Sequence, residues 1–211
     1  MMNYDLYFPT PIWWEQTEID TSDMLALCYR LRDEDQIGRK LSNEGGWQSM
    51  DFRPGVHLEM KALEDKIMEQ AENCIRDYGY QRDTLILSIE NFWFNINNKN
   101  NGNSVHFHDN SFLSGCFYIK ANPNQGKITF YKNHALDYIV ASQAHIDRYT
   151  QISASAISYD PYTGKLLMFP GHLPHGVGFN PTDEDRISVA FNIKLIRTDD
   201  ERYWPKTTQR D

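Results

Sequence analysis

The chain has 211 residues, of which 40% are hydrophobic and 24% are charged, and its formal net charge is −8. These values are typical of one globular domain, and a domain of this length buries roughly 70% of its unfolded surface without needing disulfides. The negative charge argues against a function in binding free nucleic acid or anionic membranes. It leaves a small-molecule, peptide or protein substrate open, and it says nothing about the oligomeric state.

The cysteines and the first residues of the chain indicate a cytoplasmic protein. Cys28, Cys74 and Cys116 are odd in number and widely spaced, which favours reduced, buried thiols over a disulfide framework or a zinc knuckle. The opening stretch, MMNYDLYFPTPIWW, lacks the basic and apolar regions of a signal peptide. No stretch approaches the ~20 apolar residues of a membrane-spanning helix.

Two helices are predicted in the first part of the chain. DTSDMLALCYRLRDED has apolar residues at helical spacing, with Thr21 or Ser22 as the N-cap. A second, longer stripe of apolar residues predicts a helix that ends before Gly79. Glycine is the residue preferred just after a helix, where the backbone takes the left-handed conformation. The first apolar stripe consists of Met24, Leu27, Cys28 and Leu31. The second consists of Met60, Leu63, Ile67, Ala71, Cys74 and Tyr78. LYFPTPIWWEQ is predicted as an irregular strand because prolines interrupt pairing, and SNEGGWQSMDFRPG as a loop.

The pattern then changes to short segments rich in β-branched and aromatic residues, separated by turn residues. They are DTLILSIENFWFNIN, SVHFH, LSGCFYIKA, GKITFY, ISASAISY, KLLMFP, HGVGF and RISVAFNIKLI. Seven or eight short strands after helices predict a mainly β fold, a jelly roll or barrel with the helices packed outside. We expect one domain over residues 1–211, with a helical leader (1–83), a jelly-roll core (84–197) and a tail (198–211). The Asn-rich tract 95–103 is predicted to be a hairpin loop.

The motif NSVHFHDNSFLSG places His106 and His108 two residues apart. In a strand, alternate residues face the same side, so both imidazoles point to one place while Val105 and Phe107 face away. This arrangement is typical of a metal site. A regular strand turns Asp109 away from that place, although a β-bulge could substitute its carboxylate for His108.

A third metal ligand has to come from elsewhere in the chain. KLLMFPGHLPHGVGFN is favoured, because a strand ends, a tight turn follows, and His175 opens a new strand that can bring its side chain across a barrel mouth. His172 lies close by and stays an alternative. His57, His134 and His145 are expected to be ordinary surface or core histidines.

The segment RISVAFNIKLI begins eleven residues after His175, beyond a predicted hairpin through NPTDED. Its apolar alternates predict the face that packs on the core, and they are Ile187, Val189, Phe191 and Ile193. Arg186 and Ser188 then point into the barrel beside the metal, where a guanidinium can grip a carboxylate with two parallel hydrogen bonds. A metal next to such a clamp describes a site for a 2-oxo acid that chelates iron at one end and contacts Arg186 at the other.

The order of these motifs resembles the 2-oxoglutarate/Fe(II)-dependent oxygenases. Several motifs look like those of an oxygenase family of bacteria and phages whose substrates are unknown. They are FPTPIW, SNEGGWQS, the N-x-x-H-x-H core (Asn103 to His108), LLMFPGHLPHGV and RISVAFNI. The resemblance covers most of the chain. It implies a double-stranded β-helix with Fe²⁺ on His106, His108 and His175, and 2-oxoglutarate as co-substrate on Arg186. It also implies cofactor contacts from Tyr118 and Asn95, and hydroxylation of a substrate with release of succinate and CO₂.

Other functions stay open at this point. Three histidines also suit a zinc hydrolase or lyase with an open water position, although that chemistry gives Arg186 and Ser188 no role. A cupin is expected to carry Glu four or five residues after His-x-His, where this chain has Phe112 and Leu113. The fold could also serve as a non-catalytic binding module.

The tryptophans near the N-terminus have two interpretations. Trp13, Trp14 and Trp47 could line a substrate groove, but such residues belong more often to a hydrophobic core.

Overall fold

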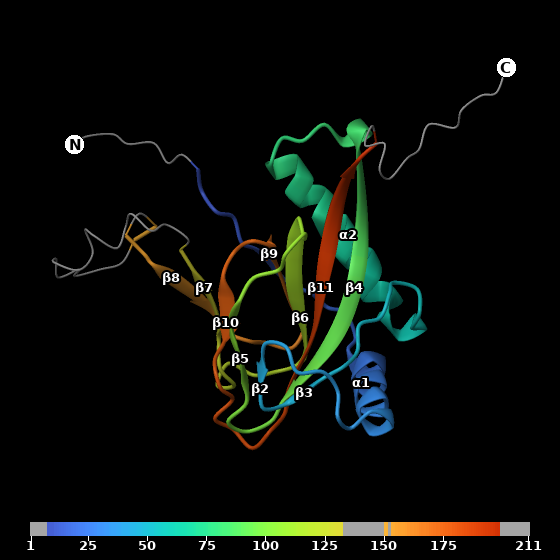
Figure 1. Ribbon diagram of the computed structural model, residues 1–211, viewed down its shortest axis with the longest axis vertical. Helices are drawn as coiled ribbons and strands as arrows, with labels where there is room; N and C mark the ends of the chain where they lie inside the picture. Colours follow the sequence, from blue (N-terminus) through green and yellow to red (C-terminus); the bar gives the residue numbers. More distant parts are fainter. Residues whose placement is uncertain (1–7, 133–149, 152, 199–211) are drawn as a thin grey trace.

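The computed structural model describes residues 8–132, 150–151 and 153–198, which form two antiparallel sheets and two main helices (Figure 1). The six-stranded sheet contains, in spatial order, β1 (Trp13–Gln16), β9 (Lys165–Pro170), β6 (Leu113–Lys120), β11 (Arg186–Arg197), β4 (Leu85–Asn97) and β3 (Trp47–Gln48). The five-stranded sheet contains β2 (Asn43–Glu44), β5 (Gly102–His106), β10 (His175–Val177), β7 (Ile128–Tyr131) and β8 (Ala156–Tyr159). The mainly β prediction is confirmed, with eight strands, β4 to β11, after Gly79 in the described ranges.

The helices lie where the apolar stripes predict them. Helix α1 (Ser22–Glu34) starts after Thr21, but neither N-cap candidate makes a side-chain cap; instead the Asp20 carboxylate accepts the Ser22 N–H at 2.9 Å. Helix α2 (Lys61–Asp77) follows the short 3-10 helix η1 (Leu58–Met60), and a second one, η2 (Arg82–Thr84), precedes β4. Gly79 has φ +73°, and its N–H donates to the Arg76 carbonyl, which closes α2 as predicted.

The six-stranded sheet separates two hydrophobic layers. Its outer face packs against α1 and α2 (Figure 1), through fully buried side chains such as Phe92, Phe94 and Phe191. Burial of each such side chain contributes about 1.5–3 kcal/mol to stability. Its inner face meets the five-stranded sheet in a smaller cluster that includes Phe130 and Phe169. Since side chains alternate along β4 and β11, each strand contributes an apolar row to the helices and a polar row to the space between the sheets.

Three local predictions are wrong. SNEGGWQSMDFRPG is not entirely loop, because β2 pairs with β5 and β3 pairs with β4 within it. The tract 95–103 is not a hairpin loop, because β4 and β5 lie in different sheets. The connection through NPTDED is not a hairpin either, because β10 and β11 also lie in different sheets. Both connections pass from one sheet to the other, so they lie at the edge of the space between the sheets.

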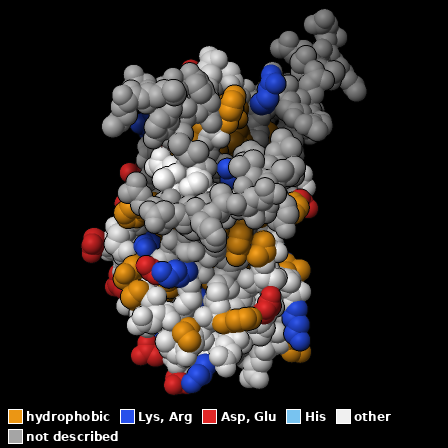
Figure 2. Space-filling model, turned by 90° about the vertical axis from the view of Figure 1, so that its left-hand side faces the viewer, with side chains coloured by type: hydrophobic (Ala, Val, Ile, Leu, Met, Phe, Trp, Pro, Cys, Tyr) orange, Lys and Arg blue, Asp and Glu red, His pale blue; other side chains and the backbone are white. Residues whose placement is uncertain are grey.

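The predicted strand SVHFH ends two residues early. β5 stops at His106, so His108 lies in the connection to β6, where its N–H donates to the Gly171 carbonyl at 2.9 Å. Val105 and Phe107 do face outward, each 58% exposed. Seen from the side of β7 and β8, the described hydrophobic side chains form small groups between charged and polar ones rather than one continuous patch (Figure 2). Within the described ranges, no helix combines the length and apolar character needed to cross a bilayer.

Candidate metal centre and anion site

A cavity between the two sheets collects the residues that the sequence singles out. It encloses about 510 Å³, part of which is open solvent. Its lining includes His106, His108, His175, Arg186, Ser188, Tyr118 and Asn95. These side chains come from β4, β5, β6, β10, β11 and the connection after β5, so the fold brings together residues far apart in the sequence.

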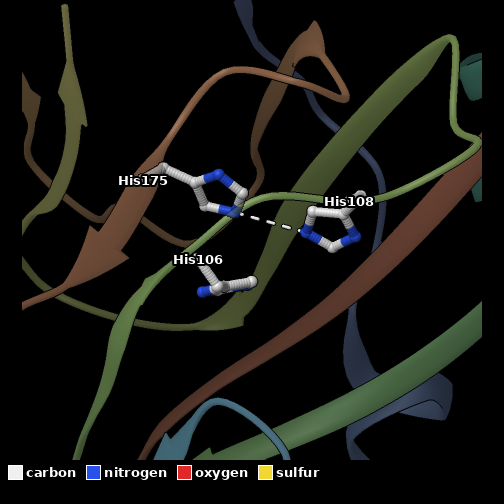
Figure 3. A group of neighbouring side chains, drawn as sticks. All are labelled: His106, His108 and His175. Atoms are coloured by element: carbon white, nitrogen blue, oxygen red, sulfur yellow. Dashed lines mark hydrogen bonds between the residues drawn. The ribbon is translucent and has the colours of Figure 1, made fainter. Parts of the chain in front are cut away.

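Three imidazoles of the cavity lining converge on one place (Figure 3). One ring nitrogen of each of His106, His108 and His175 lies within 4.8 Å of the corresponding atom of the other two. Nε2 of His108 and Nε2 of His175 are 3.3 Å apart. No carboxylate or thiol of the described residues belongs to this group. The arrangement offers three nitrogen ligands to one metal ion.

The backbone positions two of the rings directly. His106, the last residue of β5, is the register partner of His175, the first residue of β10. Nδ1 of His106 donates to the Ser104 carbonyl at 2.8 Å, and Nδ1 of His175 donates to the Leu173 carbonyl at 2.9 Å. These contacts leave Nε2 of both rings as the unprotonated nitrogen, which is how metal-binding histidines are usually oriented.

His108 reaches the group by a different route from the one predicted. It is not on a regular strand, and its ring stacks on that of Trp93, with ring centroids 5.6 Å apart and an interplanar angle of 27°. The Asn192 side chain interacts with the same imidazole. The predicted convergence of His106 and His108 is therefore confirmed, but side-chain packing, not strand alternation, produces it.

Burial keeps the three imidazoles neutral. Burial and, to a smaller extent, the neighbouring His106 lower the pKa of His175 to about 3 and that of His108 to about 4. Burial also lowers the pKa of His106. At neutral pH all three rings therefore carry a free lone pair, the form that binds a metal ion.

These pKa values predict an acid-sensitive stability for the protein after metal removal by a chelator. Above the ordinary histidine pKa of 6.5 the rings are neutral in both the folded and the unfolded chain. As the pH falls from about 6.5 towards 4, the unfolded chain takes up protons that the folded chain excludes, so the free energy of unfolding should fall. Urea unfolding at several pH values measures this free energy of unfolding, which should fall less steeply with decreasing pH in His108→Gln than in wild type. Equal dependence on pH in the two proteins would contradict the burial of a neutral imidazole at His108.

The other candidate ligands lie elsewhere. Asp109 and His172 are exposed and do not belong to the group. His57 packs edge-on against Phe52, with ring centroids 4.9 Å apart, as an ordinary structural histidine would. His134 and His145 lie outside the described residues.

Arg186 also lines the cavity and is 1% exposed. Its Nη1 donates to the backbone carbonyls of Gln125, Gly126 (3.0 Å) and Gly178 (2.9 Å). Its Nη2 is buried and has no hydrogen-bond partner among the described residues. Burial lowers the pKa of the guanidinium, and nearby Tyr118 and Cys116 oppose that shift. A buried arginine is still charged at neutral pH, so Nη2 needs an anionic acceptor that the described part of the chain does not supply.

A polar row crosses the inner face of the six-stranded sheet beside Arg186. Ser188 of β11 pairs in register with Asn95 of β4 on one side and with Tyr118 of β6 on the other. Asn95 and Tyr118 are 7% and 2% exposed, and Oδ1 of Asn95 has no partner among the described residues. The opposite face of β11 is fully buried against the helices, so the predicted orientation of Arg186 and Ser188 is confirmed.

The cavity also contains residues that the sequence did not single out for the site. Trp93, Asn97, Cys116 and Ala190 line it, next to the polar row. Extending the alternation of Asn95 by two residues in each direction would have indicated Trp93 and Asn97, and the same step from Tyr118 would have indicated Cys116.

The N-terminal tryptophans do not line this cavity. Trp47 is 7% exposed and donates from Nε1 to the Asp35 carbonyl, so it is a core residue. Trp13 packs against the same core and donates to Asp77, whereas Trp14 is exposed.

Comparison with known proteins adds a family and a fold. Residues 91–192 match the family model described as "Putative 2OG-Fe(II) oxygenase". No curated protein matches the chain in sequence. Among solved structures, a prolyl-4-hydroxylase from Pseudomonas putida is similar with a TM-score of 0.59 and 14% identity, over 88% of this chain and 93% of that chain.

Two further solved structures are similar. HygX from Streptomyces hygroscopicus, with nickel and 2-oxoglutarate bound, has a TM-score of 0.57 and 12% identity, over 88% of this chain and 83% of that chain. A viral collagen prolyl hydroxylase from Paramecium Bursaria Chlorella virus-1, in complex with 2-oxoglutarate, has a TM-score of 0.54 and 13% identity, over 86% of this chain and 94% of that chain. At these identities the likeness concerns the fold, which is a double-stranded β-helix.

Proposed function

Residues 91–192 match the 2OG-Fe(II) oxygenase family model, and from this premise we propose that the chain belongs to that family and hydroxylates an unidentified substrate, using Fe²⁺ bound by His106, His108 and His175 and 2-oxoglutarate bound by Arg186. The observation that carries the proposal is the pairing of two features in one cavity. Three neutral imidazoles converge at one place, and a buried guanidinium nitrogen without a partner lies in the same lining.

The histidines suit a divalent transition metal. Two of them donate Nδ1–H to backbone carbonyls and so direct Nε2 into the cavity, and imidazole is a good ligand for Fe²⁺. Three neutral ligands leave the charge of the ion uncompensated, and no Asp or Glu of the described residues lines the cavity. A dianionic co-substrate reduces this excess of positive charge, because one of its carboxylates offsets one of the two charges of the ion and the other offsets the charge of Arg186.

The polar row completes the co-substrate site in this proposal. Arg186 binds the distal carboxylate through Nη2, and Ser188, Tyr118 and Asn95 line the space between that carboxylate and the metal. When bound, Fe²⁺ and 2-oxoglutarate activate O₂ and transfer one oxygen atom to the substrate, and 2-oxoglutarate leaves as succinate and CO₂. The protein holds the reactants in place and limits the access of water to them.

The substrate is proposed to be a small molecule or a peptide rather than a free nucleic acid, because the chain carries a net charge of −8. The described cysteines are buried free thiols, which supports a cytoplasmic location. We also propose that residues 1–211 form one domain, because β1, β2 and β3 of the leader pair with strands of the jelly-roll core.

The ligand assignment predicts which neighbouring residues are dispensable. Asp109→Asn and His172→Ala should keep metal affinity within a few-fold of wild type, because both side chains are exposed and outside the group of three imidazoles. Metal content after dialysis against Mn²⁺, a stand-in for Fe²⁺ that resists oxidation, is the measurement. If Asp109→Asn lost the metal and His108→Ala kept it, the usual two-histidine, one-carboxylate site would replace the proposed one.

A crystal structure with Mn²⁺ and 2-oxoglutarate tests the whole arrangement. The proposal expects the ion on the three Nε2 atoms and one carboxylate of 2-oxoglutarate on Nη2 of Arg186. An ion bound elsewhere, or a ligand that does not contact Arg186, would contradict it. The part of the cavity that stays free would then define the size of the substrate.

A further inference from the structure

Two loops outside the proposed ligand set hold the Arg186 side chain. The turn between β6 and β7 supplies the carbonyls of Gln125 and Gly126, and the connection between β10 and β11 supplies that of Gly178. All three carbonyls accept from Nη1. The loops therefore fix the rotation of the guanidinium, and with it the direction in which Nη2 points.

The Gln125 side chain ties these loops to each other. Its Nε2 donates to the Glu184 carbonyl at 2.9 Å and to Oγ1 of Thr182 at 3.2 Å, both in the β10–β11 connection. Its Oε1 accepts the N–H of Asn122 at 3.0 Å within its own turn. Gln125 is 1% exposed, and it is not among the residues that line the cavity. Its side chain therefore acts on the cavity only through the loops.

Gly126 shows how closely the loops approach the guanidinium. Its φ is +83°, and a Cβ at this position would lie 2.7 Å from Nη1 of Arg186 and 2.4 Å from the Gly178 carbonyl. A side chain cannot be accommodated there without moving Arg186 or the opposite loop.

We infer that Gln125 is a positioning residue for the distal carboxylate of the co-substrate: it locks the two loops together so that their carbonyls hold Nη1 and leave Nη2 directed at the cavity. This inference rests on the proposed function. It predicts a specific defect when the lock is removed. The guanidinium gains freedom to rotate, so recognition of a distal carboxylate weakens, while chelation of the metal by the 2-oxo acid end of the ligand is unchanged.

Two ligands separate these effects. 2-Oxoglutarate has both the 2-oxo acid end and the distal carboxylate, whereas 2-oxopentanoate has the same chain length without the distal carboxylate. The ratio of their dissociation constants on the full-length, Mn²⁺-loaded protein therefore reports the contribution of the distal carboxylate alone. General damage to the cavity would weaken both ligands and leave the ratio unchanged.

The test uses Gln125→Met, which keeps the side-chain volume but removes its hydrogen bonds. Calorimetry should show 2-oxoglutarate weakened about five- to tenfold, 2-oxopentanoate changed less than about twofold, and Mn²⁺ affinity unchanged. In an Arg186→Ala background the same substitution should have no further effect on either ligand, because the two residues act as one unit.

Gly126→Ala provides a second, independent variant, and Gly79→Ala is its control. Gly79 also has a positive φ, +73°, and it lies at the end of α2 with no atom within 4 Å of an added Cβ. Both substitutions strain the backbone, but only Gly126→Ala should lower the preference for 2-oxoglutarate.

The outcomes distinguish the inference from the function on which it rests. If wild type showed no preference for 2-oxoglutarate over 2-oxopentanoate, the proposed function would fail. If Arg186→Ala abolished the preference but Gln125→Met kept it, the function would stand and the positioning role of Gln125 would be overturned, whatever the effect of Gly126→Ala. Equal weakening of both ligands by Gln125→Met would also overturn it, since that result indicates a structural role only.

Discussion

Replacing Arg186 with alanine should weaken 2-oxoglutarate binding by roughly thirty-fold or more while metal binding stays nearly unchanged. The guanidinium is 1% exposed, and Nη2 has no acceptor among the described residues. A co-substrate carboxylate bound there would lose its charged partner in a desolvated site, and the loss of one member of such a pair costs on the order of 2–5 kcal/mol. Calorimetric titration of 2-oxoglutarate into the Mn²⁺-loaded variant and wild type is the measurement.

Arg186→Lys is the informative companion variant. An ammonium group keeps the charge, but it lacks the planar geometry that places one nitrogen on the carbonyls of Gly126 and Gly178 and the other towards the cavity. We expect Lys to recover only part of the affinity. Equal affinity of wild type and Arg186→Ala would remove the anion site, and with it the main structural reason to prefer an oxygenase over a three-histidine zinc enzyme.

Replacing His175 with alanine should reduce bound metal from about one ion per chain to a small fraction of that. His175 is 4% exposed, and its Nε2 lies 3.3 Å from Nε2 of His108, so the variant removes one of three closely grouped nitrogens. His106→Ala and His108→Ala should behave in the same way. Metal analysis after dialysis measures the loss, and circular dichroism verifies that each variant is folded.

His57→Ala is the matched control for the three ligand variants. It also removes an imidazole, but one that packs against Phe52 outside the cavity, so metal content should stay at the wild-type level. If His172→Ala lost the metal and His175→Ala did not, the assignment of the distal ligand would be wrong.

Strand periodicity allowed much of the cavity to be predicted from the sequence. The apolar alternates of β11 determine which face packs against the helices, so the orientation of Arg186 and Ser188 follows from local pattern alone. The resemblance to a known family added Asn95 and Tyr118, and the sheet register places both beside Ser188. What each of these residues binds stays a prediction.

The features that the sequence could not indicate depend on contacts between distant segments. β5 ends at His106 rather than His108, because the His108 N–H is taken by the Gly171 carbonyl of the β9–β10 turn. The paths of the β4–β5 and β10–β11 connections depend on which sheet each strand joins, and alternation does not carry that information. The role of Gln125 and Gly126 is likewise visible only once their turn lies against Arg186.

The three-histidine group by itself is equally suitable for zinc, and metal content alone would not distinguish the two chemistries. What separates them is the link between the metal and Arg186. In the proposed site one ligand bridges both, so metal and 2-oxoglutarate must strengthen each other's binding by the same factor.

The most direct measurement is therefore a titration of 2-oxoglutarate into the full-length protein with and without bound Mn²⁺. The proposed site predicts one molecule per chain, bound far more tightly to the metal-loaded protein than to the metal-free protein, and loss of this difference in His175→Ala. An affinity for 2-oxoglutarate that is the same with and without metal would contradict a shared metal and co-substrate site.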